Sequence, residues 1–288
     1  IYKNPYNGKY VKTGIDHLCE LGITHVHLMP IFDFGSVDER FPGSNNRNWG
    51  YDPKNFNVPE GSYCSNPYNP VTRILELRQM IMKFHERGIR VVMDMVYNHM
   101  MSTVNMDNIV PGYYFRSDYL GRYTNGSGCG NELASERPMV RKFIIDSCLH
   151  WIKDYKIDGI RFDLMELLDI DTTKEIVKKT TKLDKNFLIY GEPWKGGSSP
   201  LVNGTYKGSQ KNENFSIFND TFRDAIRGNN HPSSGFINGN QYSSICNWSI
   251  IEGLKGSIYT ITSNPNESIN YVDAHDNYTL WDQVEKSQ

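Results

Sequence analysis

The stretch Ile157-Asp-Gly-Ile-Arg-Phe-Asp163 is an apolar run that ends in an acidic residue, and two later segments repeat this pattern. They are Phe187-Leu-Ile-Tyr-Gly-Glu-Pro-Trp194 and Ile269-Asn-Tyr-Val-Asp-Ala-His-Asp-Asn277. Each run predicts a buried strand with an acid where the strand ends. In a parallel barrel the carboxyl ends of the strands meet at one mouth. The pattern therefore predicts an enzyme whose site gathers three carboxylates, Asp163, Glu192 and Asp276.

The spacing of the first two acids fits one strand-helix repeat. Twenty-nine residues separate Asp163 from Glu192, and the helical pattern of residues 171–183 lies between them. Neighbouring parallel strands lie about 5 Å apart, so the two carboxylates are expected to face each other across a cleft. Such a pair can act as acid and base.

Composition excludes several other classes of protein. The 288 residues carry 31 basic and 33 acidic side chains, which gives a net charge of -2 and favours neither nucleic acid nor an anionic membrane. No apolar run approaches the roughly 20 residues that span a bilayer. The length suits one α/β barrel of about 250 residues. We expect a single catalytic domain over residues 1–288 that acts as a monomer.

Strand and helix patterns alternate along the chain. Besides the three acid-bearing runs, strands are predicted at 24–30, 89–97 and 215–218, and helices at 16–21, 69–87 and 137–155. A (β/α)8 barrel of the TIM type needs eight strands, whereas six are found. The prediction is an incomplete α/β barrel that lacks the first and the last strand. Its two unpaired edges would favour aggregation.

Two long connections, residues 32–68 and 98–135, leave the expected catalytic mouth. Loops longer than about 15 residues in a compact domain usually have a function. Both are rich in aromatic, Asn, Asp and Gly residues, which suits stacking on sugar rings and bonding to hydroxyls. Tyr51 and Trp49 are the candidate platforms. Packing of the loop onto the barrel is the alternative, and we favour it for Trp49.

The five cysteines are scattered, odd in number and without metal-ligand spacing, so we expect free thiols. No dense pattern of oxygen ligands is present either, and we predict no metal ion. Free thiols favour a reducing compartment such as the cytoplasm, while secretion stays open because a signal peptide can precede this segment.

Five motifs occur in an order that resembles the type I pullulanases, the debranching enzymes of the α-amylase superfamily (glycoside hydrolase family thirteen). Asn48-Trp-Gly-Tyr-Asp-Pro53 indicates the pullulanase branch. The other four indicate the superfamily, and they are Asp94-Met-Val-Tyr-Asn-His99, Gly159-Ile-Arg-Phe-Asp-Leu-Met165, Tyr190-Gly-Glu-Pro-Trp194 and His275-Asp-Asn277. The resemblance covers essentially the whole chain, and it implies an α-glucan substrate and no organic cofactor.

The resemblance also implies roles for individual residues. Asp163 would be the nucleophile, Glu192 the general acid/base, and Asp276 the acid that stabilises the transition state. Burial and the charge of Asp163 would raise the pKa of Glu192, whereas Arg161, two residues before Asp163 on the same strand face, would keep Asp163 ionised. Asp94 is expected to bond Arg161 or loop backbone.

Further residues are implied as contacts of the substrate. His99 and His275 would bond hydroxyls of the sugar beside the scissile bond, Tyr51 would stack on its apolar face, and Trp194 would form the floor. Each has a structural alternative, namely a histidine that bonds backbone at a strand end, and a Trp194 that packs over the barrel rim. The other histidines, His27 among them, are interpreted as structural.

Together these features predict a retaining hydrolase that cleaves α-1,6 linkages in pullulan, starch or glycogen-derived glucans. Another activity of the superfamily, an α-1,4 amylase or a branching transferase, is the alternative within the same class. An inactive glucan-binding segment is the alternative from a different class.

Overall fold

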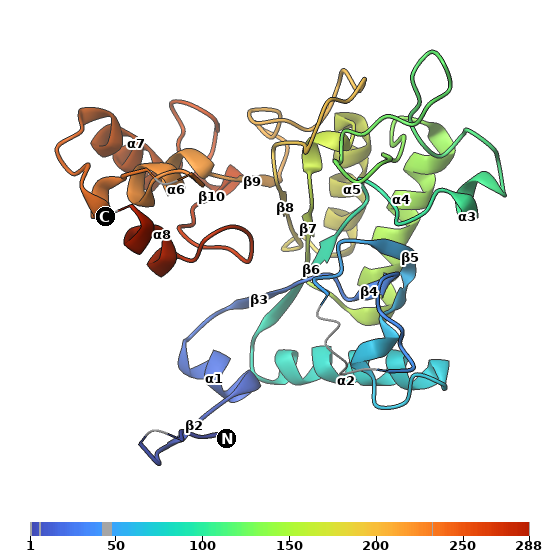
Figure 1. Cartoon of the computed structure of the whole chain (residues 1–288), viewed down its shortest axis with the longest axis horizontal. Coiled ribbons are helices and arrows are strands. Elements are labelled where there is room, and N and C mark those ends of the chain that lie inside the picture. Colours follow the sequence, from blue (N-terminus) through green and yellow to red (C-terminus); the bar gives the residue numbers. More distant parts are fainter. Residues whose placement is uncertain (1, 6, 42–47, 232, 288) are drawn as a thin grey trace.

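The fold is built on six parallel strands, as predicted. The computed structural model describes residues 2–5, 7–41, 48–231 and 233–287. The sheet has the order β10-β9-β8-β7-β6-β3, so consecutive strands are neighbours throughout (Figure 1). The strands are β3 (His25–Leu28), β6 (Arg90–Met95), β7 (Gly159–Phe162), β8 (Leu188–Gly191), β9 (Ser216–Phe218) and β10 (Ser268–Ile269). The prediction of an incomplete TIM-type barrel is confirmed.

The register of the central strands places polar groups side by side. Asp94 on β6 is paired with Arg161 on β7, and Arg161 is paired with Tyr190 on β8. Apart from Arg90 at the start of β6, the rest of β6 and β7 is apolar or glycine and is buried, with Val91, Met93 and Ile160 in the core. A sheet buried on both faces explains why these strands read as continuous apolar runs.

Helices follow most of the strands. They are α1 (Gly14–Glu20), α2 (Pro70–Glu86), α3 (Val104–Asp107), α4 (Pro138–His150), α5 (Ile170–Leu183), α6 (Asp220–Arg227), α7 (Ser244–Leu254) and α8 (Leu280–Lys286). Side chains cap several of them, as when Asp169 accepts a 3.0 Å hydrogen bond from the Thr172 amide at the start of α5. Figure 1 shows α6, α7 and α8 grouped beside β9 and β10, and α4 and α5 on the other side of the sheet. Among the described residues, no helix is both long and apolar enough to cross a bilayer.

The first long connection contains structure that the sequence did not reveal. Residues Phe32–Phe34 (β4) and Pro53–Pro59 (β5) form an antiparallel pair, followed by a short 3-10 turn at Gly61–Tyr63. The indole Nε1 of Trp151 donates a 2.9 Å hydrogen bond to the Phe56 carbonyl, so β5 is fixed against the residues that extend α4. This pair holds the Asn48–Pro53 motif near the sheet.

The last strand differs from the prediction. A strand was expected over residues 269–277, but β10 ends at Ile269 and Asp276 lies in the loop beyond it. The strand ends here because Asn270 makes side-chain bonds to the α6–α7 region. Its Nδ2 donates to the Gly253 carbonyl at 2.8 Å, and its Oδ1 accepts from Asn219. All five cysteines are free thiols, as predicted.

Candidate active site

A buried arginine holds three acids at the carboxyl end of the sheet. Nη1 of Arg161 donates to both oxygens of Asp94 at 2.8 and 2.9 Å and to Oδ1 of Asp163 at 2.9 Å. Its Nη2 lies 2.5 Å from Oε1 of Glu192. The expected Asp94–Arg161 bond is therefore present, and the side chains of Asp163 and Glu192 meet on the same guanidinium. A planar guanidinium is well suited to such a role because its donors have fixed directions.

Asp163 follows β7 directly and is held from two sides. Besides the bond from Arg161, the side-chain Nδ2 of Asn98 donates to Oδ2 of Asp163 at 2.7 Å and to the backbone carbonyl of Asp163 at 3.0 Å. Burial raises the pKa of Asp163, and the opposing charge of Arg161 does not cancel this effect. Burial therefore outweighs the lowering effect of Arg161 on this pKa, and the expectation that Arg161 holds Asp163 ionised stays a prediction.

Glu192 follows β8 and shows the shift that was predicted for an acid. Burial raises its pKa to about 7, the charge of Asp163 adds to this, and Arg161 opposes it. Its Oε2 accepts a 2.9 Å hydrogen bond from the amide of Leu164. Leu164 has a φ of 41°, a left-handed conformation that is unusual for a residue other than glycine. This turn after Asp163 directs the amide at Glu192.

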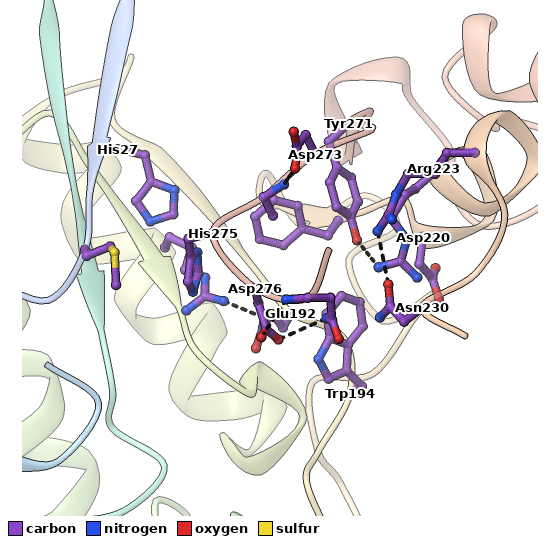
Figure 2. Close-up of a pocket in the computed structure, with 16 residues that line it drawn as sticks. His27, Glu192, Trp194, Asp220, Arg223, Asn230, Tyr271, Asp273, His275 and Asp276 are labelled. Atoms are coloured by element: carbon purple, nitrogen blue, oxygen red, sulfur yellow. Dashed lines mark hydrogen bonds and ion pairs between the residues drawn. The ribbon is translucent and has the colours of Figure 1, made fainter. Parts of the chain in front are cut away.

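Asp276 is exposed and has no bond to Arg161; its carboxylate accepts from its neighbour Asn277. It nevertheless lines the same cavity as Glu192, which has a volume of about 500 Å³ (Figure 2). The lining also includes Arg161, Trp194 and His275 and, in addition, His27, Met29, Phe218, Asp220, Arg223, Arg227, Asn230, Tyr271, Asp273, Ala274 and Asn277. Asp163 is not among the residues that line this cavity.

Tyr51 and His275 lie against each other beside this centre. The Tyr51 hydroxyl donates to Oδ2 of Asp94 at 2.7 Å and lies 2.8 Å from Nε2 of His275, and the two rings are stacked. Trp49 is half exposed and meets His275 edge to face, so it is less packed than we favoured.

His99 is buried; its Nδ1 lies 2.6 Å from Oδ1 of Asn98, and burial lowers its pKa to about 4.

Two residues near this centre were not identified from the sequence. His27, interpreted as structural, contacts Oδ2 of Asp94 at 3.3 Å and lines the cavity. Asn98 was quoted within a motif but given no role, although it bonds Asp163. Their positions in or just after a strand could have identified both residues, because His27 is in β3 and Asn98 lies three residues after β6.

Among the residues that the structure describes, one group of acids away from this centre has the geometry to hold a metal ion, formed by Asp33, Glu39 and Glu60. Arg73 donates to Glu39 at 2.7 Å, and Asn55 donates to Asp33. These bonds already compensate part of the negative charge of the group, and none of the three acids lines the cavity at Glu192.

Comparison with known proteins agrees with the fold. Residues 9–110 match the model of the α-amylase catalytic domain. The pullulanase of Bacillus subtilis (strain 168) is 43% identical over 94% of this chain, and the chloroplastic pullulanase 1 of Arabidopsis thaliana is 32% identical over 93%. The chain spans 39% and 37% of the lengths of these two relatives.

Solved structures give the same result. The pullulanase from Bacillus acidopullulyticus superposes with a TM-score of 0.93 at 46% identity, which covers 99% of this chain and 35% of that one. The Paenibacillus barengoltzii pullulanase in complex with maltohexaose and α-cyclodextrin superposes with a TM-score of 0.92 at 42% identity, over 98% of this chain and 45% of that one.

An incomplete parallel barrel with strand-end carboxylates gathered on a buried arginine, together with these matches, places the chain in the α-amylase family of catalytic domains. More narrowly, its sequence and fold are those of a pullulanase-like part of such a domain.

Proposed function

We propose that this chain supplies the catalytic carboxylates of a debranching glycoside hydrolase, which cleaves α-1,6-glucosidic bonds with retention of configuration. The observation that carries the proposal is that Asp163 and Glu192, at the ends of adjacent strands, share the guanidinium of Arg161. A retaining glycosidase needs two carboxyl groups about 5 to 5.5 Å apart, one as nucleophile and one as acid. A shared guanidinium keeps the two groups close.

In the first step Asp163 attacks the anomeric carbon and forms a covalent glycosyl ester. Glu192 gives its proton to the glycosidic oxygen, which leaves with the bonding electrons as a hydroxyl of the departing chain. A pKa of about 7 suits this role, because Glu192 then holds its proton near neutral pH and still releases it readily. In the second step Glu192 takes a proton from water, and the resulting hydroxide displaces Asp163 from the anomeric carbon.

The remaining residues assist these steps. Asp276, on the cavity wall, would stabilise the positive charge that develops at the anomeric centre and accept bonds from sugar hydroxyls. Arg161 positions the two carboxylates. Tyr51, stacked on His275, would orient that histidine toward the sugar, and His99 would bond a hydroxyl in its neutral form. Trp194 would form an apolar floor beside Glu192.

The substrate class follows from similarity. The two relatives described above, at 43% and 32% identity, are named pullulanases, and the structures at 42% identity include complexes with maltohexaose and maltotriose. For this chain we propose α-1,6 branch linkages in pullulan or in glucans derived from starch or glycogen.

Incubation with pullulan tests the proposal. The 288-residue chain is compared with a version joined to the flanking segments of the Bacillus subtilis pullulanase, and each carries an Asp163→Asn control. Maltotriose release that disappears in the control is expected. A folded, extended version that leaves pullulan intact and instead shortens amylose would replace α-1,6 cleavage with α-1,4 cleavage, and binding of glucan without any cleavage would make the chain a binding module.

A further inference from the structure

A buried ion pair lies where three loops at the carboxyl end of the sheet meet. Nη1 of Arg116 donates to Oε2 of Glu132 at 3.1 Å, and the two residues are 2% and 0% exposed. We refer to them as the buried pair. Both belong to the second long connection, which follows β6, and neither lines the cavity at Glu192. Because burial of two charges often costs as much free energy as the ion pair returns, stability alone does not account for the pair.

The carboxylate of the pair is bonded to two of the loops. Oε2 of Glu132 accepts a 2.8 Å bond from the hydroxyl of Ser199, in the loop between β8 and β9, and its Oε1 accepts from the hydroxyl of Thr124. Close to this point the Gly197 amide donates to the Gly126 carbonyl at 2.8 Å. A Cβ on Gly126 would lie 2.6 Å from Oε2 of Glu132, so the junction has no spare room. The pair therefore fixes the loop after β8 against the loop after β6.

The arginine of the pair is bonded to the third loop, between β7 and α5. Nη2 of Arg116 donates to the buried carbonyl of Leu167 at 3.0 Å, and its Nε donates to Glu136 at 3.0 Å. Leu167 ends the short 3-10 helix Met165–Leu167, and its amide donates to the Leu164 carbonyl at 2.9 Å. Arg116 thus holds one end of a turn whose other end is Leu164.

Leu164 is the residue that this turn has to hold in place. Its φ of 41° is a left-handed conformation that costs a leucine free energy and persists only when the surroundings impose it. In this conformation its amide donates to Oε2 of Glu192 at 2.9 Å, and the bond opposes the effect of burial on the pKa of Glu192. A relaxed turn would direct the amide elsewhere and leave this oxygen without its donor.

We infer that Arg116 and Glu132 are positioning residues for Glu192, the proposed acid/base. The pair holds the turn that directs the Leu164 amide at one carboxylate oxygen, and through Ser199 it fixes the loop that follows Glu192. Because the pair does not line the cavity, it acts through these groups and not on the sugar. This inference rests on the proposed function.

The amide resonance of Leu164 tests the inference without any turnover. The 288-residue chain is prepared with isotope-labelled leucine, and the signal of Leu164 is identified by its loss in Leu164→Met. Because this amide is bonded to Glu192, its chemical shift should change with pH around a midpoint of about 7. The change should be absent in Glu192→Gln, which assigns it to this carboxyl.

The deciding variant replaces both charges at once, as Arg116→Met combined with Glu132→Met. Exchange of a whole buried pair for apolar side chains of similar size is often neutral for folding. We expect a folded chain in which the Leu164 amide no longer follows Glu192. The Glu192 carboxyl, observed with isotope-labelled glutamate, should titrate about half a pH unit higher or more, because its charged form has lost a donor. Three charged residues also act on Glu192 and are unchanged in this variant, namely Arg161, Asp163 and Asp94.

Two further variants separate positioning from folding. Lys174→Met combined with Glu213→Met makes the same kind of exchange at a partly exposed ion pair outside the cavity, and both resonances should behave as in the wild type. Arg116→Lys keeps a charge beside Glu132 but lacks the fork of donors that reaches the turn, so the Leu164 titration should be lost here as well. This single variant decides the question if the double variant does not fold. Thermal unfolding midpoints are recorded for every variant.

Turnover of pullulan by the version extended at both ends gives a second readout. The double variant is expected to lower kcat at least about tenfold, because a misplaced acid transfers its proton poorly. KM should change by less than about twofold, since the cavity lining keeps all its residues.

Each other outcome has a distinct meaning. A Leu164 amide that still follows Glu192 in a folded double variant or in Arg116→Lys would overturn the inference. So would a loss that the variant at Lys174 and Glu213 shares, or a wild-type amide that does not titrate with Glu192. An extended wild type that shows the Leu164 titration but leaves pullulan intact would contradict the proposed function and not the contact between the turn and Glu192.

Discussion

The ring of Tyr51 is stacked on the ring of His275, which lies 224 positions later in the chain, with centroids 5.5 Å apart and an angle of 11° between the planes. The Tyr51 hydroxyl contacts both Nε2 of His275 and Oδ2 of Asp94. The contact therefore connects the segment before β5 to the loop after β10. Through the Tyr51 hydroxyl, the loop that carries Asp276 is also connected to Asp94, the acid that is bonded to Arg161.

Removal of this hydroxyl gives the first prediction. Tyr51→Phe keeps the stacked ring but removes both hydrogen bonds, so we expect a loss of about 1 to 2 kcal/mol in the free energy of unfolding. Turnover is expected to fall because His275 and its neighbour Asp276 lose their anchor. Urea unfolding and kcat measure the two effects. Tyr68→Phe, at a tyrosine that is 74% exposed, is the matched control and should change neither.

The two strand-end acids give the second prediction. Glu192→Gln is expected to lower kcat by about 10² to 10⁴, the usual contribution of a general acid/base, and Asp163→Asn is expected to abolish turnover because no covalent ester can form. Glucan affinity should survive in both variants. Rates on pullulan and calorimetric binding test this, and near-normal turnover in either variant would rule out the assigned roles.

The raised pKa of Glu192 gives a prediction for activity. Catalysis requires protonated Glu192, so kcat/KM should decline as pH rises through about 7, the pKa that burial produces. A pH profile on a soluble branched oligosaccharide measures this alkaline limb. Glu192→Asp, whose shorter side chain is placed differently, should move the limb as well as lower the rate, and a profile that stays flat from pH 6 to 9 would contradict the role of Glu192.

The same shift affects stability in a defined direction. In the folded chain Glu192 holds its proton to about pH 7, whereas an unfolded glutamate loses it near its ordinary pKa. The folded state therefore binds more protons between these two values, and the contribution of Glu192 to stability falls as pH rises through that window. Glu192→Gln should flatten this part of the stability profile. Urea unfolding of both proteins at pH 4.5 and pH 7.5 provides the comparison.

Asn98 gives a prediction at the acidic side of the profile. Its amide donates to Oδ2 of Asp163 and thereby lowers the pKa of that carboxyl against the effect of burial. In Asn98→Ala this donor is lost, so the pKa of Asp163 should rise and the acidic limb of kcat/KM should move to higher pH. An acidic limb that stays in place would show that Asp163 does not determine it.

The number of strands in the sheet could be predicted, and β6, β7 and β8 could be placed closely because each lies in an apolar run, whereas the bounds of β10 could not. The pairing of Asp163 with Glu192 was also predictable, since consecutive parallel strands are neighbours. The β4–β5 pair was not predictable from period-two alternation. Along Pro53–Pro59 every third residue is buried, namely Pro53, Phe56 and Pro59, which is not the alternation expected of a half-buried strand.

Other parts of the site depend on contacts that no single segment reveals. Asp276 was expected at a strand end, but Asn270 anchors the chain earlier and leaves Asp276 in a loop. The pKa of Asp163 depends on the balance between burial and one ion pair, which residue order does not give. Arg223 reads as an ordinary helix residue until Tyr271, 48 positions later, is seen to orient it.

The strands β3 and β10 are the two ends of the sheet order, yet residues in or just after each of them line the cavity, namely His27 and Met29 on one side and Tyr271 and residues 273–277 on the other. A sugar chain in the cavity would therefore touch both edges of an unfinished ring at once. Ligand binding and the distance between β3 and β10 are then thermodynamically linked. A bound glucan would stabilise one distance between these strands, and any contact that fixes this distance would change the affinity for the glucan.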